Sequence, residues 1–317
     1  MDSPAETVLA VDVGGTTIKG ALVDPAGRFL REDRRPTPAS EGGEAVVGAI
    51  ASLVGDLAAT APDPGAVRGV GLVAPGVVDG VVVFSGNLGL RGLPLGERIA
   101  AATGLAVIVE HDARAAGLAE STLGAARDVA DHLVVGIGTG ISAAVHSDRR
   151  SLRGAVGLAG EIGHVPVHPG GERCPCGQRG CLERYASAAA IARRYAELGG
   201  PRDACAREVA ARRTTDAAAA RAWSEAIDAL AIGLVACTMV ADPELIVLAG
   251  GLSEAGEELR APLAEELAAR LTWRPPPAVV TSVLGHRATL VGAAVLGWTE
   301  LPGSRVDPAD WYSPICT

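Results

Sequence analysis

Three closely spaced cysteines constrain this chain more than any other feature of its sequence. Cys174, Cys176 and Cys181 fall within eight residues, and His164 lies ten residues before the first of them. Three thiolates and one imidazole make the tetrahedral, soft-ligand set that zinc prefers. A catalytic zinc usually keeps one position open for water, so a complete set of four protein ligands predicts a structural ion.

Two carboxylates bracket this predicted metal loop. Glu161 lies three residues before His164, and Glu183 lies two residues after Cys181. A loop that is pinned by a metal and carries two carboxylates is suited to holding a polar ligand. Two alternatives stay open: a loop that zinc merely stabilises, and His168 as the fourth ligand in place of His164.

Length and composition limit the class of protein. A chain of 317 residues predicts two core-forming units, and 48% hydrophobic with 21% charged residues is ordinary globular composition. The net charge of −9, without a basic cluster, argues against a nucleic-acid partner. The longest apolar run, Ala229 to Ala241, is too short for a membrane span. Without a basic, signal-like start, and with cysteines at metal spacing, the chain is expected to be cytoplasmic.

The first chemical motif is a glycine turn between two predicted strands. Val8 to Val13 reads as a buried strand and Ile18 to Asp24 as its continuation after the turn, which predicts a hairpin. The Rossmann and Walker loops need a helix after their glycines and are therefore excluded. Backbone N–H groups in such a turn form an anion-binding concavity, and a carboxylate at the strand end would lie close to a phosphate-bound Mg²⁺. The residues concerned are Asp12, Gly14, Gly15, Thr16 and Thr17.

A second hairpin repeats this pattern. Strands predicted at His132 to Ile137 and Ile141 to His146 flank the turn Gly138-Thr139-Gly140. Two such hairpins in two α/β halves predict a duplicated architecture with a nucleotide between the halves. Lys19, the only lysine in the chain, lies just after the first turn, where a compact ammonium suits a phosphate.

A candidate base follows another predicted strand. Ala106 to Val109 runs into Glu110-His111-Asp112, and Ala113 to Leu123 then reads as a helix. A carboxylate between a buried strand and a helix is a typical base position, and N-capping is the alternative for Asp112. Farther along, Leu182 to Leu198 predicts one helix, and the tail after Pro302 is expected to be loosely packed.

These motifs together resemble the ROK family of sugar kinases and repressors. The resemblance runs from about Val8 to Trp298, and its most specific parts are Gly160-Glu-Ile-Gly-His164 and Cys174-Pro-Cys-Gly-Gln-Arg-Gly-Cys-Leu-Glu183. It implies a two-domain α/β fold of the actin-like/hexokinase type (ribonuclease H-like), an ATPase fold with its active-site cleft between the domains. We expect residues 1–117 and 299–317 to form the small domain and residues 118–298 the large domain with the zinc loop.

The same resemblance implies an ATP-dependent kinase that phosphorylates the 6-hydroxyl of glucose or a close analogue. Asp112 would be the general base, ATP and Mg²⁺ the cofactors with a structural Zn²⁺, and a homodimer the assembly. Sugar contacts would come from Asn87, His111, Asp112, Glu161, His164 and Glu183. The two glycine turns and Lys19 would bind the ATP phosphates, with Gly250 and Gly251 near the adenosine.

Two departures from the family pattern bear on the substrate. Family glucokinases usually read Glu-Asn-Asp where this chain has Glu110-His111-Asp112, and the loop after Asn87 lacks their usual Gly-Trp. An amino sugar such as kanosamine and a C7 cyclitol are therefore alternative substrates. A non-catalytic, sugar-sensing ROK protein is the alternative of another class. A zinc hydrolase fits poorly, because the predicted zinc has no open position.

Overall fold

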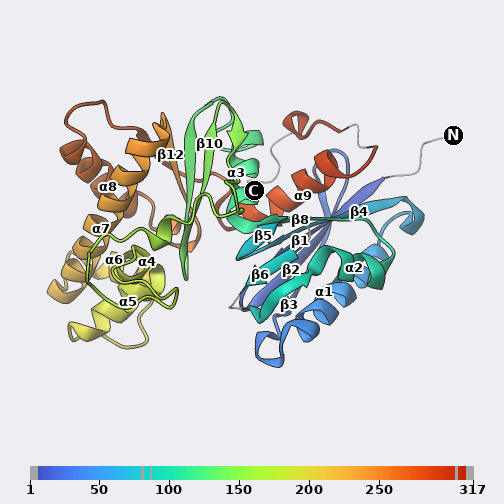
Figure 1. The fold of residues 1–317 in the computed structure, drawn as a ribbon, viewed down its shortest axis with the longest axis horizontal. Helices are drawn as coiled ribbons and strands as arrows, with labels where there is room; N and C mark the ends of the chain where they lie inside the picture. The colour runs from blue at the N-terminus through green and yellow to red at the C-terminus, as the bar shows by residue number, and fades with distance from the viewer. Residues whose placement is uncertain (1–5, 80–81, 86–87, 304–305, 312–317) are drawn as a thin grey trace. The chain divides into compact units, whose positions relative to one another are not determined.

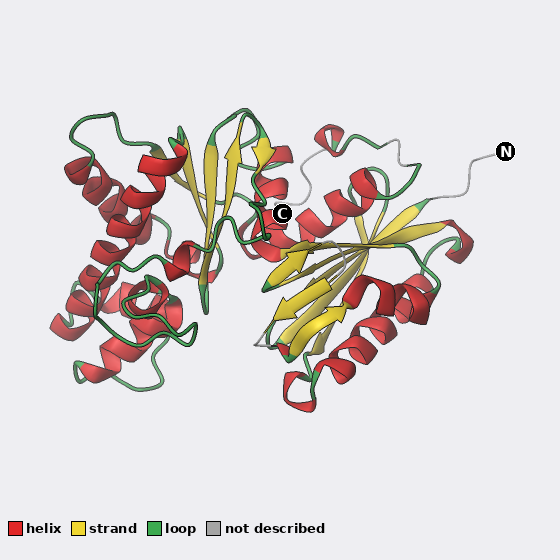
Figure 2. Cartoon of the chain, in the orientation of Figure 1, coloured by secondary structure: helices red, strands yellow, loops and turns green. Residues whose placement is uncertain are grey.

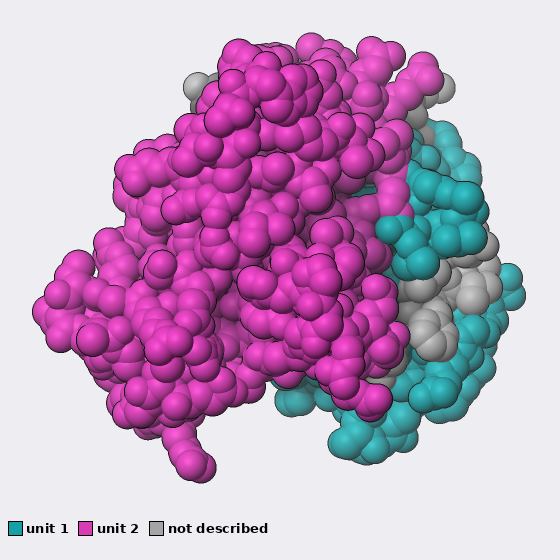
Figure 3. All heavy atoms as spheres, turned by 60° about the vertical axis from the view of Figure 1, so that its left-hand side comes forward, with its two compact units in different colours: residues 1–124, 153–158, 287–317 teal, residues 125–152, 159–286 magenta. Residues whose placement is uncertain are grey.

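The computed structural model describes residues 6–79, 82–85, 88–303 and 306–311. The chain divides into two compact units, which Figure 3 distinguishes by colour. Unit 1 comprises Met1–Gly124, Arg153–Leu158 and Arg287–Thr317, and unit 2 comprises Ala125–Leu152 and Ala159–His286. Each unit is an α/β structure built around a five-stranded sheet (Figure 1).

The main sheet of unit 1 has the order β3-β2-β1-β4-β8. Strands β1, β2 and β3 are antiparallel neighbours, whereas β4 is parallel to both β1 and β8. A small antiparallel sheet, β5-β6-β7, accompanies it. The elements are β1 (Thr7–Val13), β2 (Thr17–Val23), β3 (Phe29–Pro36), α1 (Gly43–Ala58), β4 (Val67–Ala74), β5 (Val77–Asp79), β6 (Val82–Ser85), β7 (Leu90–Pro94), α2 (Leu95–Thr103), β8 (Val107–His111), α3 (Asp112–Thr122) and α9 (Ala288–Glu300).

Helices cover both faces of this sheet (Figure 2). Alternate residues of β1, Leu9 and Val11, pack in one apolar cluster with Ile50 and Leu53 of α1. The other face lies against α9, which also packs on α3. The α9 backbone comes so close that a Cβ at Gly71 of β4 would lie 2.0 Å from a carbonyl oxygen of the helix. A fully buried β1 follows from this two-sided cover.

Unit 2 repeats the sheet order and strand directions of unit 1. Its sheet runs β11-β10-β9-β12-β13, with β9, β10 and β11 antiparallel and with β12 parallel to β9 and β13. The predicted duplication of an α/β unit that begins with a hairpin is therefore confirmed. The elements are β9 (His132–Ile137), β10 (Ile141–Ser147), β11 (Arg150–Ser151), α4 (Glu183–Ala186), α5 (Ala188–Glu197), α6 (Ala206–Arg212), α7 (Ala217–Ala241), β12 (Leu245–Ala249), α8 (Glu257–Arg270) and β13 (Ala278–Thr281).

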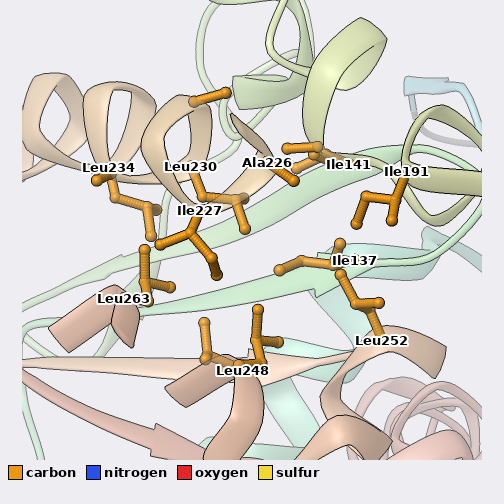
Figure 4. Close-up of a cluster of buried hydrophobic side chains, with 14 of the residues drawn as sticks. Ile137, Ile141, Ile191, Ala226, Ile227, Leu230, Leu234, Leu248, Leu252 and Leu263 are labelled. Carbon is orange, nitrogen blue, oxygen red and sulfur yellow. The ribbon is translucent and has the colours of Figure 1, made fainter. Parts of the chain in front are cut away.

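The largest apolar core lies on one face of the unit 2 sheet. Ile137 and Leu248 of the sheet pack with Leu230 and Leu234 of α7 and with Leu263 of α8 (Figure 4). Among helices of the described residues, α7 alone is long and apolar enough to cross a membrane by length and composition. It packs against α4, α5, α6 and α8, as expected for a core helix.

Three features differ from the sequence-based expectations. The compact units do not coincide with the expected domain division, because α9 and Arg153–Leu158 pack with unit 1. The single helix expected from Leu182 onward is two helices, because Ser187 leaves the helical conformation and its side chain caps α5. The expectation of a loosely packed tail is wrong for Trp311, which is 5% exposed and donates from Nε1 to the Pro25 carbonyl.

Candidate active site

The predicted first hairpin is present at the end of β1. Strand register pairs Asp12 with Lys19 across the β1–β2 hairpin. Gly14 N–H donates to the Thr17 carbonyl at 3.0 Å, and a Cβ on Gly14 would lie 2.9 Å from that oxygen. Glycine is therefore required for this tight turn, while Gly15 beside it is exposed with open space around it.

Asp12 is a buried carboxylate with one cationic partner among the described residues. Its Oδ2 lies 3.3 Å from Lys19 Nζ. Burial raises the pKa of Asp12, and the negative charge of Asp112 raises it further, whereas Lys19 opposes the shift. Burial and repulsion by a second carboxylate create a local demand for positive charge. The chain's only lysine is thus placed where it partly meets that demand.

Asp112 lies at the same edge of the unit 1 sheet as Asp12. β1, β4 and β8 are parallel neighbours, Asp12 is near the carboxyl end of β1, and Asp112 directly follows β8. The carboxyl ends of parallel strands are the usual place for ligand-binding residues in α/β sheets. The N-capping alternative is wrong, because His111 occupies the N-cap position and Asp112 is the first residue of α3.

The two oxygens of Asp112 have different surroundings. Oδ1 accepts the Ala113 backbone N–H at 2.6 Å and lies 3.3 Å from His111 Nε2. The Asp112 side chain is 36% exposed, whereas the His111 side chain is only 6% exposed. Asp112 is thus anchored through one oxygen and remains open to solvent and ligands.

A buried carboxylate network behind Asp112 was not found from the sequence. Glu110 accepts from Arg114 Nε at 2.8 Å, and Arg153 binds its other oxygen. Arg114 also donates to the Gly157 carbonyl at 2.8 Å, which ties the segment Arg153–Leu158 to unit 1. The Glu110–Arg114 spacing of four residues was the only sequence signal for this network. Two arginines occupy both oxygens of Glu110, so this carboxylate supports the site.

The second predicted hairpin, between β9 and β10, is held by Glu183. Gly138 N–H donates to the Gly140 carbonyl at 2.9 Å, closing a turn around Thr139. Glu183 Oε2 accepts the Ile141 N–H at 3.1 Å, and a Cβ on Gly140 would lie 2.4 Å from that oxygen. The carboxylate predicted to hold a sugar therefore also braces the second glycine turn.

The segment Gly160 to His164 lies directly on β10. A Cβ on Gly160 would lie 1.9 Å from the Ala143 carbonyl oxygen, and one on Gly163 would lie 2.2 Å from the Ile141 carbonyl oxygen. Ala143 N–H also donates to the Gly160 carbonyl at 2.7 Å. The glycines of this motif thus permit backbone contact that fixes Glu161 and His164 beside the hairpin.

His164, Cys174, Cys176 and Cys181 form the predicted cluster of metal ligands. Their ligand atoms lie within 4.8 Å of one another. The Cys176 Sγ–Cys181 Sγ distance is 3.7 Å and the Cys174 Sγ–His164 Nδ1 distance is 3.8 Å. Tetrahedral zinc with Zn–S bonds of about 2.3 Å places its sulfurs about 3.8 Å apart, so the donor set fits zinc.

The alternative ligand His168 is engaged elsewhere. Its ring packs edge-on against Tyr185 with centroids 4.4 Å apart, and the cluster of the described residues contains His164 instead. His164 Nδ1 faces the thiols while Nε2 lies 3.9 Å from Glu161 Oε2. The two ring nitrogens thus face different groups, as a doubly used histidine requires.

Three predicted site residues remain, namely Gly250, Gly251 and Asn87. Gly250 has a positive φ of 80° and packs so tightly on Ile137 that a Cβ would lie 2.7 Å from its carbonyl oxygen. Gly251 follows it with open space around its Cα. Asn87 lies outside the described residues.

Two α/β units of the same topology, each opened by a glycine hairpin, define the class of actin-like/hexokinase-type proteins. Residues 8–300 match the family model described as the ROK family, and the chain belongs to that family. It is 35% identical over 312 residues to a glucokinase from Thermotoga maritima, covering 92% of this chain and 97% of that protein. A match of 38% over 187 residues to an N-acetylmannosamine kinase from Citrobacter koseri covers 59% of this chain and 63% of that protein.

The solved structures agree with this assignment. A ROK family glucokinase from Streptomyces griseus, crystallised in complex with glucose and AMPPNP, has a TM-score of 0.81 and 31% identity. The match covers 92% of this chain and 99% of that one. The expected two-domain, actin-like/hexokinase-type α/β fold is thereby confirmed.

Proposed function

We propose that this chain is an ATP-dependent sugar kinase that phosphorylates the 6-hydroxyl of glucose or of a close glucose analogue. The observation that carries the proposal is the position of Asp112, a partly exposed carboxylate at the strand edge that also carries Asp12. The glucokinase relatives, which match this chain over more than nine-tenths of its length, support the same activity.

Asp112 is the proposed general base. In the transfer, the O–H bond of the sugar breaks and its proton passes to the Asp112 carboxylate. The freed oxygen forms a bond to the terminal phosphorus of ATP, and ADP leaves with the electron pair of the broken P–O bond. One base of this kind contributes about 10²–10⁴-fold to the rate.

The phosphate-binding role falls to the two glycine turns. The first turn covers residues 14–17 and the second covers residues 138–140. Backbone N–H groups of such turns, together with the threonine hydroxyls, are donors that suit phosphate oxygens. Gly250 and Gly251 are assigned to the adenosine by the family resemblance alone.

Asp12 is the proposed carboxylate for the magnesium ion that accompanies ATP. Magnesium bound with ATP would neutralise charge that develops on the transferred phosphoryl group. Asp12 fits such a cation, because it is buried, repelled by Asp112 and balanced only in part by Lys19. The ammonium of Lys19 would add a second positive charge near the phosphates.

Sugar recognition is assigned to Glu161, His164 and Glu183. Carboxylates accept hydrogen bonds from neighbouring hydroxyls, and His164 Nε2 faces away from the thiols. Zinc bound to the cluster would hold the His164 ring through Nδ1, the nitrogen that faces the thiols, and would thereby orient the sugar contacts. A homodimeric assembly and a cytoplasmic location stay predictions, the first of them from the family resemblance.

The first test measures ADP release from Mg-ATP with glucose, mannose, N-acetylglucosamine, kanosamine and a C7 cyclitol. Asp112→Asn is expected to lower turnover by about 10²–10⁴-fold while sugar binding, followed by calorimetry, is retained. Asp63→Asn, at an exposed cap outside the site, is the matched control. Unchanged turnover in Asp112→Asn would contradict the assigned base.

The same panel separates the candidate functions. The highest kcat/KM with glucose supports a glucokinase, and a higher value with kanosamine or the cyclitol supports a biosynthetic kinase. Sugar binding without ADP release from any of the sugars would favour the non-catalytic sensor and contradict the kinase.

A further inference from the structure

Three carbonyl groups of the first glycine turn accept hydrogen bonds from the protein itself. The Thr17 carbonyl accepts the Gly14 N–H at 3.0 Å. Thr37, which directly follows β3, provides the other two bonds. Its Oγ1 donates to the Gly14 carbonyl at 2.7 Å, and its backbone N–H donates to the Thr16 carbonyl at 3.0 Å. The turn is therefore held by a residue that lies 23 positions beyond Gly14 in the sequence.

The local sequence restricts the backbone of Thr37. Pro36 ends β3, where it pairs with the first residue of β2. Pro38 follows Thr37, and a residue that precedes proline is biased towards extended conformations. Arg35 ties the end of β3 to α1 through a hydrogen bond from Nη1 to Ser52 Oγ at 2.8 Å. The Thr37 hydroxyl is thus presented to the turn by a segment with little conformational freedom.

The hydrogen bond to the Gly14 carbonyl sets the direction of a neighbouring N–H group. The Gly14 carbonyl and the Gly15 N–H belong to one planar trans peptide, so they point in opposite directions. Because the carbonyl faces the Thr37 hydroxyl, the Gly15 N–H points away from it. Among the residues that the structure describes, no acceptor lies at this N–H, and Gly15 is exposed with open space around it. The Gly15 N–H is therefore available to a ligand.

We propose that Thr37 is a positioning residue for the phosphate-binding turn, and this inference rests on the proposed kinase function. The Thr37 hydroxyl holds the Gly14 carbonyl in one orientation, so that the Gly15 N–H is directed at a phosphate oxygen of ATP. Without this bond the peptide would be free to rotate, and its carbonyl oxygen would repel the phosphate. A donor that is oriented before the ligand arrives binds it without the cost of reorganisation.

The kinetic test removes the hydroxyl and keeps the shape of the side chain. In Thr37→Val the bond to the Gly14 carbonyl is lost, whereas the backbone bond to the Thr16 carbonyl is kept. We expect KM for ATP to rise about 3–10-fold, the usual effect of one hydrogen bond, with KM for the sugar unchanged. Thr37→Ser keeps a hydroxyl and should bring KM for ATP back close to the wild-type value.

Thr60→Val is the matched control. Thr60 also lies in unit 1, and its Oγ1 also donates to a backbone carbonyl at 2.7 Å, that of Leu57. Because Thr60 follows α1 and lies outside the glycine turn, KM for ATP should not change in this variant. Thermal melts of each variant verify folding.

Three kinetic outcomes would overturn the proposal. Wild-type kinetics in Thr37→Val would show that the turn does not need the hydroxyl. A raised KM for the sugar alone would make Thr37 a sugar contact. Equal losses in the Val and Ser variants would refute the hydrogen-bonding role.

A spectroscopic test does not depend on turnover. The backbone ¹H–¹⁵N signal of Gly15 is followed by nuclear magnetic resonance while Mg-AMPPNP, a non-hydrolysable analogue of ATP, is added without sugar. We expect a downfield shift of the amide proton in the wild-type protein and a smaller shift at saturation in Thr37→Val. A Gly15 signal that does not respond to the nucleotide in the wild-type protein would refute the inference. A wild-type protein that shows the expected shift but phosphorylates no sugar would instead refute the proposed function alone.

Discussion

At the scale of single residues, the acidic side chains of the candidate site differ in their partners. Asp12 faces a lysine, Glu110 two arginines, and Glu183 the backbone N–H of the second hairpin. Asp112 lies 3.3 Å from a histidine nitrogen, accepts the N–H of Ala113, the second residue of its own helix, and remains partly exposed. The base role therefore suits Asp112 better than Glu110, because arginines occupy both oxygens of Glu110.

Another residue-scale feature is a buried pair of stacked histidines in unit 2. His132 and His146 are paired across β9 and β10, with ring centroids 4.3 Å apart and planes 11° apart. Burial, followed by repulsion from His132, lowers the pKa of His146 to about 4, and burial also lowers the pKa of His132. An unfolded histidine titrates near 6.5, so between about pH 6.5 and 4 the unfolded chain binds more protons.

The free energy of unfolding should therefore fall as the pH decreases from about 6.5 towards 4. A complete shift of His146 corresponds to about 3 kcal/mol, and stability above about pH 6.5 should be unaffected by this group. His146→Phe keeps a stacked ring without a titrating group and should flatten the pH dependence, measured by urea unfolding at about pH 7.5 and about pH 5. The same slope in His146→Phe and in His286→Phe, a control at an exposed histidine, would contradict this expectation.

Individual residues of the candidate site could be predicted from the sequence where they belong to a short local motif. The cluster of cysteines with His164 was predicted from spacing. The position of Asp112 between a strand and a helix was also predicted, whereas its role as the base stays a proposal. Arg153 was missed because it contacts Glu110 from 43 residues away, and only the folded chain brings them together. The hydrogen bond from the Ala113 N–H to Asp112 Oδ1 was likewise beyond a sequence pattern, since it depends on the side-chain conformation of Asp112 in the folded chain.

At the scale of elements, the zinc loop offers a direct test. Cys176→Ser removes one of four ligands, so the purified protein should lose its zinc, about one ion per chain by mass spectrometry, and should bind sugar less tightly. Cys237→Ser, in α7 and outside the cluster, should retain both. Wild-type protein that is active without zinc would refute the proposed role of the metal.

Most regular elements were predictable because apolar periodicity marks them. The two hairpins and the strand–helix unit around Asp112 were found in this way. Strand β3 was missed because its sequence, FLREDRRP, is charged, and an edge strand with largely exposed side chains shows no apolar alternation. The end of α4 was missed because Ser187 reads as an ordinary helix residue until its side chain caps α5.

At the scale of the whole molecule, the C-terminal segment stabilises unit 1. Trp311 lies over Gly27, where an added Cβ would be 2.4 Å from the indole, and Nε1 donates to Pro25 at 3.0 Å. Trp311→Ala should lower the free energy of unfolding by about 3–5 kcal/mol, measured by urea unfolding. Trp273→Ala, at a residue 72% exposed, should change it by less than about 0.5 kcal/mol. If the two substitutions changed the free energy of unfolding by the same small amount, the C-terminal segment would contribute nothing to the stability of unit 1.

The division of the chain into units was the least predictable feature. Helix α9 follows the last strand of unit 2 in sequence but packs on β1 and β4 of unit 1. Its apolar sequence suits burial in either unit, and the close approach at Gly71 becomes visible only in three dimensions.

The position of α9 also sets the order in which a growing chain can complete its parts. During translation, β1 emerges from the ribosome before any segment of unit 2, and α9 emerges after all segments of unit 2. Domains generally fold as units during synthesis. Unit 2 is fully made once His286 has emerged, while the nascent sheet of unit 1 still lacks the helix that covers one face. The synthesis of unit 1 thus starts earlier than that of unit 2 but ends later. The apolar face of its sheet that α9 covers stays exposed while unit 2 is translated.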